Sequence, residues 1–505
     1  MKNSELELRP TDITNGSEPK RNENSEPNRS CLGKIRAAIA FLTIEPFLLC
    51  YILPNSISSI AVQRLNLEKA CRVDLGHTKE KCDEWDGNIT IAIQSMVADM
   101  TTWQVPLTSA IPAIVILFVG AWSDRTGIRK ALMLVPIFGE LVSAFGLVLT
   151  TYYFEEWPLF VTALIESLPT AFSGGFSIAL MGSYSYLADV TSVESRTFRI
   201  GIAAVIVTLG APAAISISGV LLDVIGYYGI FGLTTALYAF GLLYTYFRIH
   251  DVNPKKTEGT WYQKLIIFFH PKNAWDTLYI VFKKGPNRSK IILVLLAHVV
   301  IIGPVFGEGA MLYQYLLFKY SMDDVEISLF FTFSILVGLC GTAVAVTLFS
   351  KFMKMHDAIL GVIATTCKVS SSVVYALAPT RPWFYSGPFF DFFGGTGVTA
   401  IRSLGTKVVA PEEVGMFVLL FFSFRDAKIL ENYRTPTSPT VSMCSLIGLV
   451  EAITPVIYTP MYSQMYKATI ETLPGAFYLL GGAMTVPAFF IFMYVTFAYV
   501  PTVFL

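Results

Sequence analysis

The sequence predicts an all-α membrane protein with twelve transmembrane helices arranged in two six-helix bundles. Hydrophobic residues make up 53% of the 505 residues and charged residues only 15%, a composition typical of chains that cross a membrane many times. Apolar runs long enough to cross a bilayer recur after residue 36. None shows the alternation of a barrel strand, so we expect helices, which satisfy their own backbone hydrogen bonds in lipid. The predicted spans are residues 37–62, 103–122, 131–153, 159–187, 200–222, 229–248, 291–318, 328–350, 358–379, 384–406, 444–466 and 474–500.

The distribution of charge around these spans predicts the topology. Residues 1–36 are polar and have no apolar core, which indicates a disordered tail and not a signal peptide. Twelve spans place both termini on one side, and most Lys and Arg residues outside the spans lie there, so we expect both termini to be cytoplasmic. The basic segment 249–290 is the longest predicted cytoplasmic connection between spans. It divides the chain into bundles 37–248 and 291–505.

Loop 63–102 is the one long segment predicted on the outer side. It carries the glycosylation sequon Asn88-Ile-Thr90, so Asn88 is the expected acceptor. The same loop contains Cys71 and Cys82, which would face an oxidising compartment. The sequence leaves two alternatives: the two cysteines form a disulfide, or they stay as free thiols.

Residues 416–443 depart from the regular pattern of spans and loops. They begin strongly apolar, turn abruptly polar, and are too short to cross a bilayer and return. We interpret the stretch as a gene-model artefact such as translated intron, with a genuine cytoplasmic insertion as the alternative.

A short charged loop between the second and third spans is the most informative motif. Gly120–Lys130 follows the order Gly-x-x-x-Asp-Arg-x-Gly-x-Arg-Lys and resembles the loop between helices 2 and 3 of major facilitator transporters. Cations alone would set topology, but they do not explain the acidic residue or the glycines. We therefore expect a conformational latch. Its residues are Asp124, Arg125, Gly127, Arg129 and Lys130.

A second charged segment follows span 4 and provides the expected partners of this loop. Asp189, Glu194, Arg196 and Arg199 lie within twelve residues of the sequence. Pairing between the two segments would hold one access state of the carrier.

The resemblance extends to solute carrier family 46, the proton-coupled folate transporter family, over roughly residues 40–500. The resemblance implies import of an organic, often anionic solute coupled to protons, without a cofactor. Two departures weaken a specific folate assignment: Gly201–Gly210 has no acidic residue, and His298 lies earlier than the family's span-7 histidine. The matching segments are Ile44-Glu45-Pro46, the Gly120–Lys130 loop, Ala188–Arg199, Leu312-Tyr313, Ile401-Arg402 and Leu473-Pro474.

In two-bundle carriers of this kind, helices 1, 4, 7 and 10 line the central cavity. The corresponding predicted spans supply candidates for substrate binding. Arg402 is always charged and can hold a carboxylate through two hydrogen bonds. Asp391 lies eleven residues earlier, about three helical turns, and so on the same face of a continuous helix. The alternative is a structural ion pair between these two residues, or an anchoring role for Arg402.

Glu308 and His298 are the candidates for proton coupling. A partly buried carboxyl can exchange a proton near neutral pH, and a histidine titrates there without any perturbation. A hydrogen bond to a neighbouring helix is the plainer role for Glu308, and packing is the plainer role for His298. Glu140 is expected to stabilise bundle packing, Glu166 stays open, and Lys368 is expected to snorkel or to pair.

These features favour a secondary active transporter that imports an organic anion with protons by alternating access. The alternatives are a non-transporting receptor or chaperone and an uncoupled uniporter on the same fold. No nucleotide-binding loop or hydrolase motif occurs, so we expect neither an ATP-driven pump nor an enzyme, and no basic block indicates nucleic-acid binding. We expect a monomer or loose dimer in the plasma membrane, with a lysosomal or endosomal membrane left open.

Overall fold

The computed structural model describes residues 43–83, 87–191, 193–252, 268–269, 271, 288–353, 355–401 and 439–499, and in these residues the regular structure is helical, without a strand. The predicted tail 1–36, most of the central connection, Arg402 and residues 416–438 of the atypical stretch lie outside the described residues, whereas residues 439–443 begin a helix that continues to Thr469.

The first half of the chain forms a set of long helices with two glycine breaks. Gly174 has φ 87°, a left-handed conformation that only glycine adopts without strain, and it separates α6 from α7 within predicted span 4. Gly226 interrupts α8 with φ 61°, between predicted spans 5 and 6. The elements are α2 (Glu45–Lys69), continued by the π-helix η1 (Ala70–Asp74), α3 (Lys79–Asp83), α4 (Gly87–Thr126), α5 (Ala131–Tyr152), α6 (Leu159–Ser173), α7 (Gly175–Val190) and α8 (Val193–Arg248).

The second half repeats this pattern, with one break that corrects a prediction. We expected one continuous helix over residues 384–406, but α14 ends at Phe390 and residues 391–395 form a turn. Gly394 and Gly395 explain the turn, since glycine lowers helix stability. The argument that Asp391 and Arg402 share one helical face therefore fails. The elements are α11 (Arg288–Tyr320), α12 (Asp324–Val344) with η2 (Ala345–Phe352), α13 (Asp357–Leu377), α14 (Arg381–Phe390), α17 (Pro439–Thr469) and α18 (Ala476–Tyr499).

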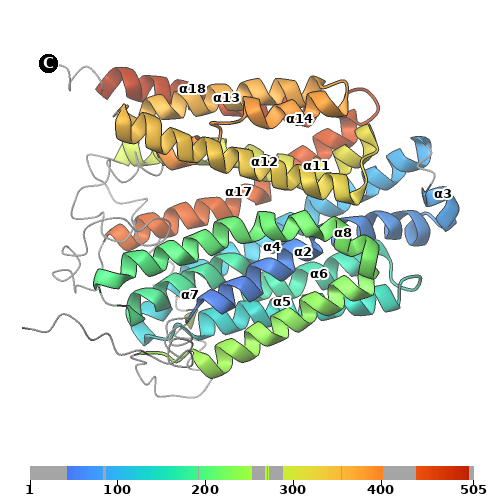
Figure 1. The fold of residues 1–505 in the computed structure, drawn as a ribbon, viewed down its shortest axis with the longest axis horizontal. Helices are drawn as coiled ribbons and strands as arrows, with labels where there is room; N and C mark the ends of the chain where they lie inside the picture. The colour runs from blue at the N-terminus through green and yellow to red at the C-terminus, as the bar shows by residue number, and fades with distance from the viewer. Residues whose placement is uncertain are drawn as a thin grey trace, which may run out of the picture. The chain divides into compact units, whose positions relative to one another are not determined.

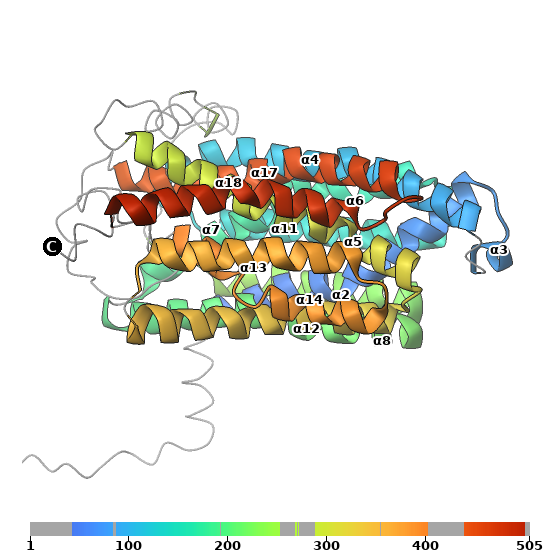
Figure 2. The same ribbon diagram turned by 90° about the horizontal axis from the view of Figure 1, so that it is seen from above.

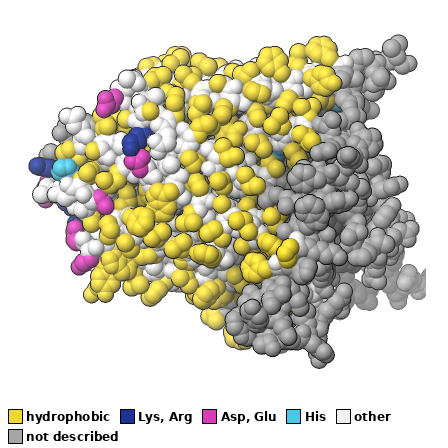
Figure 3. Space-filling view, turned by 180° about the vertical axis from the view of Figure 1, so that it is seen from behind, with side chains coloured by type: hydrophobic (Ala, Val, Ile, Leu, Met, Phe, Trp, Pro, Cys, Tyr) yellow, Lys and Arg dark blue, Asp and Glu magenta, His cyan; other side chains and the backbone are white. Residues whose placement is uncertain are grey.

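Nine helical segments of the described residues are long and apolar enough to cross a membrane. One of them, Arg199–Arg248, has 50 residues, more than a single crossing needs. In Asp324–Phe349 only 17% of the apolar window is buried, so the remaining apolar side chains face outward as they do toward lipid. Figure 3 shows apolar side chains over most of one described face, with charged groups gathered at one end. The count of twelve spans stays a prediction.

Helices run further than the apolar spans at the end that carries α3. Loop 63–102 was predicted between spans, yet α2 continues to Lys69 and α4 already begins at Gly87. Hydropathy underestimates both helices because their ends are polar. Arg64 and Glu68 pair at helical spacing with an N–O distance of 3.1 Å, which supports the extension of α2.

The two halves meet through two pairs of helices. α4 packs along α17, and α8 packs along α12, and both pairs lie side by side in the two ribbon views (Figures 1 and 2). A shared hydrophobic core joins the halves near the Cys71–Cys82 segment. It includes Leu65 of α2, Tyr313 of α11 and Phe477 of α18.

Separate cores occur at the opposite end of the described helices. In the first half, Phe47, Met133 and Leu187 belong to one cluster. In the second half, Leu360 and Phe492 belong to another. Within the described residues, therefore, the halves share apolar packing at the end near Cys71 and Cys82 and have their own cores at the other.

Candidate functional site

Two carboxylates share one ammonium group inside the second half. Lys368 Nζ of α13 lies 2.7 Å from Glu308 Oε2 of α11 and 3.7 Å from Asp391 Oδ2, directly after α14. The side chains of Lys368 and Glu308 are 13% and 10% exposed, and that of Asp391 is 28% exposed. With every group ionised the triad would carry one net negative charge, so it has room for one proton or one further cation.

Polar atoms around Glu308 are left without partners. Glu308 Oε1, Asp391 Oδ1 and the Tyr462 hydroxyl are buried and make no hydrogen bond to the described residues. Gly481 leaves room for two of these atoms. A Cβ at this position would lie 2.3 Å from Glu308 Oε1 and 2.8 Å from the Tyr462 hydroxyl. The free carboxylate oxygen is therefore available to a proton.

His298 forms a separate pair at another level of the same helix. Its Nε2 lies 3.0 Å from Glu451 Oε1 of α17, and its side chain is fully buried. The pair joins α11 to α17. The two predicted proton-coupling residues therefore have different partners. Glu308 contacts Lys368, which also faces Asp391, and His298 contacts Glu451. In the described residues, no three His, Cys, Asp or Glu side chains are grouped to hold a metal ion.

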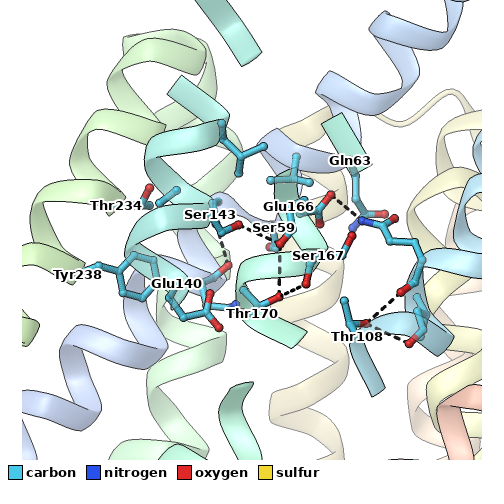
Figure 4. A pocket seen from close by; sticks show the side chains of 17 residues that line it. Ser59, Gln63, Thr108, Glu140, Ser143, Glu166, Ser167, Thr170, Thr234 and Tyr238 are labelled. Carbon is cyan, nitrogen blue, oxygen red and sulfur yellow. Dashed lines mark hydrogen bonds between the residues drawn. The ribbon is translucent and has the colours of Figure 1, made fainter. Parts of the chain in front are cut away.

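The first half contains a polar cavity of about 360 Å³. Five helices line it: α2, α4, α5, α6 and α8. Figure 4 shows that Glu140 and Glu166 lie in it among Ser and Thr side chains. Glu140, which we expected to stabilise packing, therefore lies beside open space, in the size range of small-molecule sites.

Both cavity carboxylates accept hydrogen bonds from neutral groups. The Tyr51 hydroxyl donates to Glu140 Oε1 at 2.9 Å, and Gln104 Nε2 donates to Glu166 Oε2 at 2.9 Å. The Ser143 hydroxyl donates to the backbone carbonyl of Glu166 at 3.0 Å, which ties α5 to α6. These bonds fix the orientation of the carboxylates without neutralising their charge.

The structure brings the two predicted latch segments together through Arg129. Its Nε lies 3.1 Å from Asp189 Oδ2 at the end of α7, and its Nη1 donates to Ser123 Oγ at 2.6 Å. Gly127 turns the chain with φ 70°, a left-handed conformation suited to glycine.

Asp251, just after α8, holds the end of this loop and was missed in the sequence. Its Oδ1 accepts from the backbone nitrogens of Arg129 at 2.7 Å and Lys130 at 2.8 Å. These nitrogens precede α5, where the first N–H groups of a helix need acceptors. The side chains of Asp124, Arg125 and Arg196 lie outside the described parts of the structure.

Arg199, a predicted latch residue, also forms a buried ion pair that the sequence did not predict. Its Nη2 lies 3.0 Å from Glu45 Oε1 and donates to Thr43 Oγ1 at 2.7 Å. The pair is buried and joins the start of α2 to α8. Arg199 therefore ties two helices of the first half together.

The segment that follows α2 is closed by a disulfide between Cys71 and Cys82. Lys69 is fully buried, and its Nζ donates to the carbonyls of Phe154 and Trp157 at 2.9 and 2.7 Å, a suitable partner for the chain after α5. Asn88 lies exposed in the first turn of α4, where it stays a predicted glycosylation acceptor.

The Major Facilitator Superfamily family model matches residues 87–430, more than half of the sequence. The chain belongs to the major facilitator superfamily. A member of this superfamily with this helical fold is a multi-pass membrane transporter and not an enzyme.

Relatives within the superfamily are distant but cover most of the chain. A chicken (Gallus gallus) protein described as a lysosomal proton-coupled steroid conjugate and bile acid symporter, SLC46A3, is 23% identical over 88% of this chain and 91% of its own. The proton-coupled folate transporter of Rattus norvegicus is 24% identical over 74% of this chain and 73% of its own. These relatives confirm the resemblance to solute carrier family 46.

Solved transporters share the fold. A POT family transporter in complex with 5-aminolevulinic acid superposes with a TM-score of 0.58 and 14% identity, over 90% of this chain and 95% of that chain. This likeness confirms the major facilitator fold.

Proposed function

We propose that this transporter imports a small organic anion together with protons, and that the triad of Glu308, Lys368 and Asp391 carries the coupling proton. The observation that supports the proposal is that two carboxylates share one largely buried ammonium, with the three groups on three different segments. A charged group inside a membrane protein normally marks an ion pathway, and an uncompensated one is costly. Uptake of one proton neutralises the triad.

The helix packing supports alternating access as the way this proton is moved. The halves share a hydrophobic core near Cys71 and Cys82 and have separate cores elsewhere in the described residues. We propose that 37–248 and 291–505 move as two six-helix bundles, with both termini cytoplasmic in the plasma membrane. The described conformation is then the one sealed on the outer side. Arg402, by sequence, is the proposed clamp for the substrate carboxylate.

Reconstituted transport tests the proposal. Purified protein in liposomes is given a panel of labelled organic anions, with the outside either acidic or at the same pH as the inside. We expect accumulation above equilibrium only with the acidic outside, and its loss on adding a protonophore. Glu308→Gln should abolish gradient-driven accumulation but retain exchange of solute across the membrane. Glu80→Gln, a control at an exposed carboxylate, should behave like the wild type.

Two results would contradict this function. Accumulation that ignores the pH gradient would exclude proton coupling. Equilibration of a solute without accumulation, in wild type and variant alike, would indicate a uniporter.

A further inference from the structure

The polar cavity of the first half plays no part in the proton site proposed above, and the charged groups that line it are acidic. Among the described residues, its lining includes two carboxylates, Glu140 and Glu166, and no Lys, Arg or His. Glu140 is only 9% exposed. The two carboxylates lie on neighbouring helices within electrostatic reach of each other. A site of this composition attracts positive charge.

The hydroxyl groups of the cavity increase this bias. Every Ser and Thr hydroxyl that lines it donates its hydrogen to a backbone carbonyl of its own or an adjacent helix. The oxygen of each hydroxyl can then only accept a hydrogen bond from a ligand. The groups are Ser58, Ser59, Thr108, Ser143, Ser167, Thr170 and Thr234.

The remaining donors are weak competitors for the carboxylates. They are the neutral side-chain amides of Asn55, Gln63 and Gln104 and the hydroxyl of Tyr238. Gln104 already donates to Glu166, and the Tyr238 hydroxyl already donates to Glu140. Tyr238 contributes an aromatic ring to the wall, and such a ring can support a cation through its face. The cavity therefore offers many acceptors, two acidic groups and an aromatic side chain.

We propose that this cavity binds the cationic group, an ammonium or guanidinium, of the transported solute. The inference rests on the proposed transport function, because the bound group belongs to the solute that is carried. A cation would satisfy the carboxylates and the hydroxyl oxygens together, through charge-assisted hydrogen bonds. Because the proposed function is import of an organic anion, the substrate class becomes small solutes that carry both an acidic and a basic group.

A pair of probes that differ in charge tests the proposal. Tyramine and N-acetyltyramine share a ring and a chain, but only tyramine carries an ammonium group near neutral pH. Binding of each to the detergent-purified full chain is measured by thermal shift and by calorimetry, with agmatine as a guanidinium probe. We expect tyramine to bind at least about tenfold more tightly than N-acetyltyramine, since hydrogen bonds to charged groups are the stronger ones.

Variants locate the binding in the cavity. Glu166→Gln keeps the size of the side chain and should weaken tyramine about tenfold while leaving N-acetyltyramine unchanged. Glu140→Gln should do the same, and either variant suffices if the other fails to fold. Glu80→Gln, at an exposed site, should leave the binding of both probes unchanged.

Three outcomes would overturn the inference. They are equal binding of the two tyramines, equal binding by wild type and Glu166→Gln, and no binding of tyramine or agmatine up to millimolar concentrations. Because these measurements need no proton gradient, their failure leaves proton-coupled uptake untouched. Loss of gradient-driven uptake would in turn leave the binding result standing.

Discussion

The two halves of the molecule bury acidic side chains in contrasting ways. In the second half, Glu308 and Asp391 face a lysine at 2.7 and 3.7 Å. In the first half, Glu140 and Glu166 accept hydrogen bonds from Tyr51 and Gln104, and none of the described residues that line their cavity is basic. The second half therefore supplies a cation of its own for its carboxylates. In the first half, a bound ligand could supply the cation instead.

This difference suggests that the second half binds the proton and the first half binds part of the solute. An ion triad with one excess carboxylate changes its net charge when a single proton binds. A cavity of about 360 Å³ with uncompensated carboxylates has space for part of a solute. Separate sites for the proton and for a solute group, one in each half, would let relative movement of the halves couple the two.

Removal of the internal counter-charge should have the largest effect. Lys368→Met would leave Glu308 and Asp391 buried without a cation, which costs about 3–5 kcal/mol when one partner of a buried pair is lost. We expect a marked fall in the thermal unfolding temperature in detergent, together with loss of uptake.

The compensating variant makes this expectation specific. Adding Glu308→Gln and Asp391→Asn to Lys368→Met removes the uncompensated charge and should restore most of the lost thermal stability. If Lys368→Met alone unfolds at the wild-type temperature, the lysine does not balance the triad.

The two carboxylates of the triad should differ in their effect on coupling. Glu308 lies 2.7 Å from Lys368 Nζ and Asp391 lies 3.7 Å from it, and the Glu308 side chain is less exposed, at 10% against 28%. We expect Glu308→Gln to reduce gradient-driven uptake about tenfold or more, and Asp391→Asn to reduce it less, because the more deeply buried carboxylate gains more from losing its charge. The measurement is initial uptake at matched protein levels over a range of outside pH. A larger loss from Asp391→Asn would assign the proton to that residue instead.

Local sequence patterns predicted much of the fold but little of the interior chemistry. The apolar runs located the helices, and the Gly-x-x-x-Asp-Arg-x-Gly motif predicted a charged loop whose Arg129 contacts Asp189. Tertiary pairings such as Lys368 with Glu308 join helices sixty residues apart, and no local spacing encodes them. Lys368 was recognised as unusual in its span, but its partner depends on how α13 packs against α11.

The turn at Asp391 and the cavity in the first half show two further limits. Gly394-Gly395 is a visible signal in the sequence for a break in the helix, but glycine pairs also occur where helices only pack closely. Glu140 and Glu166 lie on different helices and form no motif, so the cavity follows only from the packing of five helices.

The loop of the first half provides a weaker test of the contrast between halves. Arg129 and Asp189 form a pair whose side chains are 15% and 43% exposed, so solvent screens it. We expect Arg129→Gln and Asp189→Asn each to slow uptake only about threefold, and the double variant to be no slower than either single one. The measurement is a double-mutant cycle of uptake rates, with each variant at the same level in the membrane. Fully additive effects would show that the pair does not act as a unit in any latch.

The smallest effect is expected at an exposed ion pair between the halves. Lys467 Nζ of α17 lies 2.5 Å from Asp99 Oδ2 of α4, and these side chains are 40% and 50% exposed. Such a pair contributes less than about 1 kcal/mol and weakens further in salt. Lys467→Ala should therefore shift the unfolding temperature slightly, and the shift should shrink as salt is added. A shift as large as that of Lys368→Met would mean that the α4–α17 contact, and not the buried triad, holds the most costly charge in the molecule.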